Sequence, residues 1–142
     1  MLTELNDVYQ EVIQSLEKEL QYSVKMHPYA APPGFHIFED TEDQEASIHI
    51  DTPFNKVYWP GQIKVPFSFT VALALPEKAG LNFGEELEFI PYREGYMYLH
   101  DGLTTHQIAK PTPSSVESPR ITLQGHGAII GQEGLEQAWI YF

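Results

Sequence analysis

Ile48-His49-Ile50-Asp51 is the stretch that decides the predicted fold and site of this chain. It ends an apolar-alternating run, 46–50 (ASIHI), and such a run predicts a β-strand. Successive side chains of a strand point to opposite faces, so His49 and Asp51 would leave the strand on the same face. An imidazole and a carboxylate in that arrangement can bind one metal ion together.

Two later segments would complete the site. His106 follows a turn at 101–103 and would supply a second imidazole, which gives the 2-His-1-carboxylate set of a non-heme iron with open coordination positions. Arg120 carries a planar, permanently charged fork that suits a carboxylate beside the metal, and Thr122 points the same way. His100 also follows a short apolar run and competes with His106; the spacing to Arg120 favours His106.

The order of these motifs resembles the iron(II)/2-oxoglutarate-dependent dioxygenases, in particular their prolyl-hydroxylase-like members. H-x-D at 49–51 is followed by His106 after 55 positions, and R-x-T at 120–122 begins 14 positions after His106, which is similar to the family's spacing. Residues 84–89 (GEELEF) look like the family's glycine-containing strand, and 95–100 (GYMYLH) look like the strand that leads to the distal histidine. The resemblance covers residues 36–127.

The resemblance implies a fold, a set of cofactors and a reaction. Fe(II) would be bound by His49, Asp51 and His106, and 2-oxoglutarate would chelate the metal while its far carboxylate pairs with Arg120 and Thr122. O₂ would take the remaining position. Oxidative decarboxylation of 2-oxoglutarate would then be coupled to hydroxylation of a small molecule or of a peptide or protein side chain.

The chain departs from the family in two respects. In prolyl-hydroxylase-like members a tyrosine helps to hold the cosubstrate carboxylate, and its counterpart here falls near Ala74, so Thr70 or a tyrosine from another strand would have to replace it. The chain is also short, with one N-terminal helix where larger members have several supporting elements. A homo- or hetero-oligomer, in which another subunit covers an exposed sheet face, is a hypothesis that follows.

The remaining pattern predicts a mainly β domain with one N-terminal amphipathic helix. Residues 3–22 have apolar side chains at three- and four-residue steps, typical of a helix that covers one side of a sheet. Eight strands are predicted, a number that suits a double-stranded β-helix, the jelly roll that cupins also use. We therefore expect a single domain, 1–142, with a jelly-roll core from about residue 35 to 142. The predicted strands are 35–39, 46–50, 66–75, 86–90, 96–100, 105–109, 120–130 and 137–141.

Three further residues are candidates for the pocket. The long loop 52–65 begins directly after Asp51, and its Tyr58 and Trp59 are candidates for lining the site, although packing against the barrel rim explains them equally well. His126 has the strand parity of Arg120, so it would point into the barrel, either toward a ligand or into the core. The glycines at 125 and 127 leave space beside it.

Composition excludes several classes of function. The chain has 142 residues and a net charge of −12, and a field of that sign repels nucleic acid. There is no cysteine, which excludes thiolate metal sites and disulfides. No apolar run reaches the roughly 18 residues of a membrane span, and no secretory signal is apparent, so we expect a cytoplasmic protein that does not bind membranes.

Two alternatives remain open. A cupin-like metalloprotein would use the same ligands with zinc or another ion for hydrolysis or isomerisation, but this alternative does not explain Arg120 and Thr122. A non-catalytic relative would use the pocket to bind a ligand or a partner chain.

Overall fold

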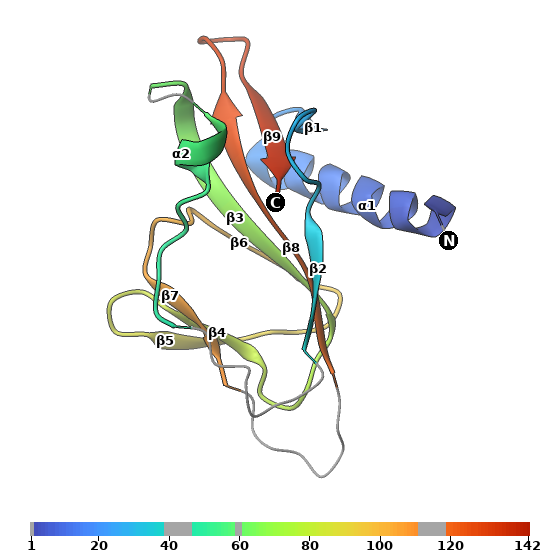
Figure 1. The fold of residues 1–142 in the computed structure, drawn as a ribbon, viewed down its shortest axis with the longest axis vertical. Helices are drawn as coiled ribbons and strands as arrows, with labels where there is room; N and C mark the ends of the chain where they lie inside the picture. The colour runs from blue at the N-terminus through green and yellow to red at the C-terminus, as the bar shows by residue number, and fades with distance from the viewer. Residues whose placement is uncertain (1, 39–46, 59–60, 111–118) are drawn as a thin grey trace.

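The computed structural model describes residues 2–38, 47–58, 61–110 and 119–142. It contains two sheets, with a long helix at the N-terminus (Figure 1). The prediction of a mainly β chain with an N-terminal helix is confirmed. The elements are α1 (Leu2–Leu20), β1 (Val24–Met26), β2 (Gly34–Phe38), α2 (Phe54–Val57), β3 (Ile63–Ala74), β4 (Gly80–Phe83), β5 (Glu88–Pro91), β6 (Met97–His100), β7 (His106–Ala109), β8 (Arg120–Ile130) and β9 (Gln137–Tyr141).

The long strand β8 organises the larger sheet, because it pairs with β2, β3 and β9. Along the described residues this sheet has six strands in the order β1-β9-β8-β3-β6, with β2 beside the first half of β8 and β9 beside its second half. The smaller sheet has the order β5-β4-β7, and His49 adds an antiparallel bridge to His106 at the start of β7. Residues of both sheets line the pocket that holds the candidate site.

Helix α1 covers the outer face of the larger sheet. Its buried side chains include Val12 and Leu16, which belong to one core cluster with Phe67, Phe69 and Leu123 of the sheet. Burial of an aliphatic side chain such as Leu16, which is fully buried, contributes about 1.5–3 kcal/mol. The helix thus holds β3 and β8 in place, and these are the strands that carry several of the candidate site residues.

Two glycines of β8 are explained by their neighbours across the sheet. Gly125 pairs with Phe69 and Gly127 with Phe67 in the β3–β8 ladder. A Cβ at Gly127 would lie 2.2 Å from Cζ of Phe67, and one at Gly125 would lie 2.7 Å from Cζ of Phe69. The two phenylalanine rings therefore lie over the glycine backbone on the α1 side of the sheet, the face opposite to that of His126.

Several predicted elements differ from the structure. The strand predicted at 46–50 is wrong for the described residues 47–50, where only the bridge of His49 forms. The strand predicted at 86–90 is the second half of the β4–β5 hairpin, and its turn places Gly84 and Leu87 at φ of 80° and 52°. The short elements β1, α2 and β4 were not predicted, because segments of this length show too little periodicity to be recognised.

Helix α1 was predicted at 3–22 and ends two residues earlier. Gln21 has φ of 61°, the left-handed conformation in which helices commonly terminate. Within the described ranges, no helix combines the length and the apolar character that a membrane crossing needs.

Candidate metal centre

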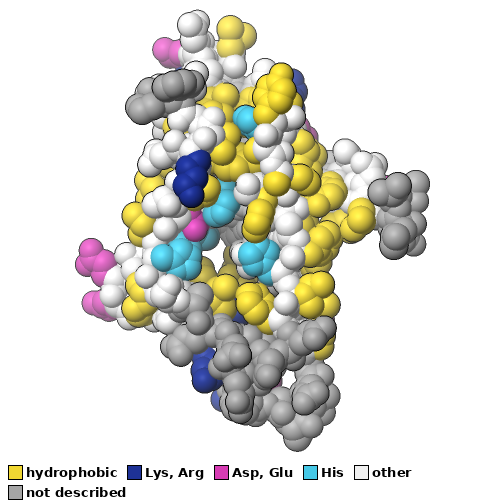
Figure 2. Space-filling model, in the orientation of Figure 1, with side chains coloured by type: hydrophobic (Ala, Val, Ile, Leu, Met, Phe, Trp, Pro, Cys, Tyr) yellow, Lys and Arg dark blue, Asp and Glu magenta, His cyan; other side chains and the backbone are white. Residues whose placement is uncertain are grey.

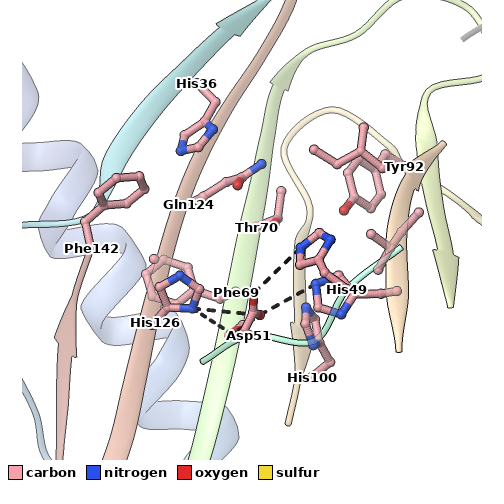
Figure 3. A pocket seen from close by; sticks show the side chains of 15 residues that line it. His36, His49, Asp51, Phe69, Thr70, Tyr92, His100, Gln124, His126 and Phe142 are labelled. Carbon is pink, nitrogen blue, oxygen red and sulfur yellow. Dashed lines mark hydrogen bonds and ion pairs between the residues drawn. The ribbon is translucent and has the colours of Figure 1, made fainter. Parts of the chain in front are cut away.

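His49, Asp51 and His106, here called the triad, are brought together as the sequence predicted. One ligand atom from each lies within 4.8 Å of the others, so the group can hold a metal ion. Nε2 of His49 is 3.9 Å from Oδ1 of Asp51, and Nε2 of His106 is 3.6 Å from Oδ2 (Figure 3). Ligand atoms at right angles with bonds of about 2.1 Å lie about 3 Å apart, so these atoms would move closer together to bind an ion.

Backbone hydrogen bonds position the residues of the triad. The amide of His49 donates to the carbonyl of His106 over 3.0 Å, and the amide of His106 donates back over 2.9 Å. The amide of Asp51 donates to the carbonyl of Gly102 over 2.8 Å. The two imidazoles are therefore opposite each other across one bridge, with their ring centroids 4.5 Å apart. This bridge replaces the predicted strand as the element that aligns the ligands.

The hydrogen bonds of His49 and His106 engage Nδ1 and leave Nε2 of each ring able to bind a metal. Nδ1 of His49 lies 2.6 Å from the carbonyl of Ser47, and Nδ1 of His106 lies 2.8 Å from that of Thr104. A carbonyl oxygen only accepts, so each Nδ1 must carry the proton. Nε2 of each ring then keeps its lone pair, the arrangement found in most histidine metal ligands.

His100 has the opposite tautomer. Its Nδ1 accepts a hydrogen bond of 3.1 Å from the amide of Gly102, so the neutral ring carries its proton on Nε2 and has no free lone pair. Burial, followed by the neighbouring His106, lowers the pKa of His100 to about 4 and keeps the ring neutral. His100 lines the pocket as a hydrogen-bond donor, and the group able to hold an ion contains His106 instead.

The pocket lies over the triad and has a volume of about 270 Å³. Histidine side chains surround its opening in the space-filling view (Figure 2), and Figure 3 shows several of the residues that line it. Asp51 is the one carboxylate among the described lining residues, with five histidines. The lining residues are His36, His49, Asp51, Ser68, Phe69, Thr70, Leu81, Tyr92, His100, His106, Ile108, Gln124, Gly125, His126 and Phe142.

Arg120 lies behind this pocket and does not line it. Its side chain is fully buried, with Nη1 3.4 Å from the carbonyl of Ala109 and Nη2 3.3 Å from that of Gly80. Both bonds are long for charged donors, and Nε has no partner among the described residues. Burial lowers the pKa of the guanidinium, and the adjacent Tyr92 opposes that shift. Arg120 is thus a buried cation with weak polar contacts within the described part of the chain.

Tyr92 connects this cation to the pocket. The guanidinium carbon is 5.3 Å from the centre of the Tyr92 ring. Burial raises the pKa of Tyr92, and the neighbouring Arg120 and Thr70 side chains oppose that rise. Tyr92 and Thr70 both line the pocket. The predicted partner Thr122 is also fully buried, where its hydroxyl accepts a 3.0 Å bond from Gln124, and it does not line the pocket.

The other three pocket candidates have different outcomes. His126 lines the pocket, as its strand parity predicted. Tyr58 does not line it; the residue packs in a core cluster with Phe54 and Tyr141, and burial raises its pKa to about 12. The reason is that α2 turns loop 52–65 back onto β8 and β9. The candidate Trp59 lies outside the described residues.

Of three further polar residues of the site, Thr70 was named from the sequence as a possible replacement for the family's tyrosine, whereas Ser68 and Tyr92 were not singled out. Ser68 donates a hydrogen bond of 2.6 Å to Asp51, and Thr70 and Tyr92 line the pocket. The sequence carries a signal for Ser68 and Thr70. They alternate with the buried Phe67 and Phe69 on one strand, which is the pattern of a polar inner face. Tyr92 follows the short strand β5 and has no such signal.

No protein-family model matches this chain, and no curated protein matches it either.

Proposed function

We propose that this protein is an Fe(II)/2-oxoglutarate-dependent oxygenase that hydroxylates a small molecule or a peptide or protein side chain. The observation that carries the proposal is the combination of a triad able to hold a metal with a buried guanidinium behind the same pocket. The described residues give Arg120 no carboxylate partner; burial of a charge in that state is costly, and a carboxylate at Arg120 would compensate for that cost. A dicarboxylate that bound the metal with one end would supply such a group with the other.

The proposed fold is a double-stranded β-helix. Strands β2, β3, β6 and β8 lie in the larger sheet, whereas β4, β5, β7 and the bridge of His49 belong to the smaller one. From β2 to β8 the chain therefore crosses repeatedly between two facing sheets, as it does in a jelly roll. This alternation supports the assignment, because it explains how ligands from one sheet and Arg120 from the other approach a common interior.

The tautomers of the triad support a facial site for Fe(II). Nε2 of His49 and of His106 both have free lone pairs, and Asp51 adds a negative charge that favours a divalent cation. Because the triad supplies three donors, the remaining positions of an octahedral ion would be open for a chelating ligand and for O₂. The five-histidine lining without cysteine suits a borderline metal.

Tyr92 and Thr70 support the assignment of the far end of the pocket to 2-oxoglutarate. Both residues line the pocket and the Tyr92 ring packs against the guanidinium, so a carboxylate at this end would accept hydrogen bonds from both hydroxyls and would lie near Arg120. Tyr92 would replace the family's tyrosine that is missing near Ala74. Thr122 would act indirectly, since its hydroxyl is engaged by Gln124.

The residues of this chain have distinct roles in the proposed reaction. When bound, Fe(II) with 2-oxoglutarate supplies an oxidising centre that transfers one oxygen atom of O₂ to a C–H bond. The triad holds the ion on one side so that the opposite side is open to the pocket. Arg120, Tyr92 and Thr70 would orient the cosubstrate, while Leu81 and Ile108 provide an apolar wall that excludes water.

An anaerobic titration tests the proposal. Metal-free protein receives Fe(II) and then 2-oxoglutarate, and the weak visible charge-transfer band of a chelated keto acid is recorded. We expect the band in the wild type. Arg120→Lys, which keeps the charge but loses the fork, should need at least about tenfold more 2-oxoglutarate. Lys64→Ala removes an exposed cation that pairs with Glu136 and is the control that should titrate like the wild type.

Absence of the band from a folded, metal-loaded wild type would contradict the proposal. Metal analysis of the purified protein would then decide between a cupin-like metalloprotein with another ion and a binding protein.

A further inference from the structure

Two consecutive hydrogen bonds connect the larger sheet to the Asp51 carboxylate of the triad. Ser68 is 4% exposed, and its Oγ donates to Oδ2 of Asp51 over 2.6 Å. The hydroxyl has a single proton, so its 2.9 Å contact with Nδ1 of His126 requires the imidazole to donate. The direction of these hydrogen bonds is therefore fixed, from His126 to Ser68 to Asp51.

The β3–β8 pairing holds Ser68 and His126 in position. Ser68 and His126 are directly opposite each other in the β3–β8 ladder, so the register keeps their side chains adjacent on the inner face. The ring of Phe54 packs edge-on against His126 with centroids 5.8 Å apart. Gly102 leaves room for the serine, because a Cβ there would lie 2.8 Å from Ser68 Oγ. The donor pair is thus preorganised before any metal binds.

We infer that Ser68 and His126 are positioning residues that restrict Asp51 to monodentate binding of the metal through Oδ1. A carboxylate oxygen that accepts a short hydrogen bond is the weaker donor to an ion, and here that oxygen is Oδ2. Oδ1 lies 3.9 Å from Nε2 of His49 and would bind the metal, whereas Oδ2, 3.6 Å from Nε2 of His106, would stay bonded to Ser68. If Asp51 instead chelated with both oxygens, it would occupy one of the positions that the proposed reaction needs.

The inference depends on the metal site of the proposed function but not on 2-oxoglutarate, so the test uses metal alone. Metal-free protein is titrated with Co(II), whose visible d–d bands report coordination number. Ser68→Ala should weaken Co(II) binding about tenfold and change the d–d spectrum, because loss of an outer hydrogen bond to a ligand typically costs 10- to 100-fold in affinity. Ser15→Ala, in the exposed part of α1, is the matched control and should reproduce the wild type.

A second pair of variants separates positioning from packing. His126→Asn places an amide donor where Nδ1 lies and should retain the wild-type spectrum and affinity. His126→Leu has no donor and should shift both in the direction of Ser68→Ala. This pair also decides the question if Ser68→Ala does not fold.

The inference is overturned if Ser68→Ala binds Co(II) with the wild-type affinity and spectrum, or if His126→Asn and His126→Leu behave alike. It is also overturned if the wild type binds no Co(II). Wild-type protein that shows these Co(II) effects but no charge-transfer band with Fe(II) and 2-oxoglutarate would contradict the proposed function alone.

Discussion

The substitution Gly127→Ala tests the packing that supports the inner face of β8. A methyl group at this position would lie 2.2 Å from Cζ and 2.5 Å from Cε2 of Phe67, and Cβ contacts below 3.0 Å essentially never occur in proteins. The ring would have to move by about 1 Å or more, but Phe67 is 2% exposed and packs in the core beneath α1. Overpacking of this kind costs about 1–3 kcal/mol of unfolding free energy.

Urea unfolding of three variants measures this cost. Gly34→Ala in β2 is the matched control, since its Cβ would approach no atom closer than 3.4 Å, and its stability should equal or exceed that of the wild type by up to about 1 kcal/mol. The double variant Gly127→Ala with Phe67→Leu should be less destabilised than the sum of its single changes, because the smaller side chain relieves the overlap. In thermal unfolding, each kcal/mol should lower Tm by roughly 4 °C.

One result would refute the reasoning. If Gly127→Ala and Gly34→Ala had the same stability, the Phe67 ring would not lie over the glycine, and the explanation of the two β8 glycines would be wrong.

Three other predictions concern the site. Co(II) at 100 times its Kd should stabilise the protein by about 2.7 kcal/mol, measured as a rise in Tm that EDTA reverses, and a His106→Ala variant that showed the same rise would contradict the ligand assignment. Tyr92→Phe should weaken 2-oxoglutarate binding about tenfold or more without changing Co(II) affinity, as measured by the two titrations; equal 2-oxoglutarate affinity would exclude Tyr92 from that end of the pocket. The low pKa of His100 should make the metal-free protein less stable as the pH falls from 6.5 toward 4, because the unfolded state binds the proton first. Urea unfolding across this range should show a smaller decline in His100→Asn, and an identical decline would show that other groups dominate.

The regular elements of this chain were predictable from sequence because their signals are local. The strand ranges 120–130 and 137–141 match β8 and β9, and the helix at 3–22 differs from α1 by one or two residues at its ends. These segments are long or strongly periodic, and their burial follows from the same pattern. The triad was predictable for a related reason, since its residue types and order limit the chemistry they can perform.

The remaining features depend on contacts between distant segments. The spacing to Arg120 favoured His106 over His100, but no sequence pattern shows the physical difference between them, which is the backbone group that meets each Nδ1. Ser68 reaches Asp51 because it lies opposite His100 in the β3–β6 ladder and the Asp51 amide is bonded to Gly102, two residues after His100. Tyr58 was a pocket candidate from its place in the loop, yet α2 directs it into the core. Loop geometry and cross-strand register therefore set the limit of the prediction.

The bridge between His49 and His106 affects how easily this edge of the protein unfolds locally. Among the described residues, segment 47–52 has no continuous ladder: that single bridge holds it to the smaller sheet, and Asp51 is bonded through its amide to Gly102 and through its carboxylate to Ser68. Few hydrogen bonds of this kind allow local opening at low free-energy cost, which hydrogen exchange of the His49 and Asp51 amides would report. A metal held by residues 49, 51 and 106 would close a loop of more than fifty residues, much as a covalent cross-link does. Metal binding and the final folding of this edge would then be one cooperative event.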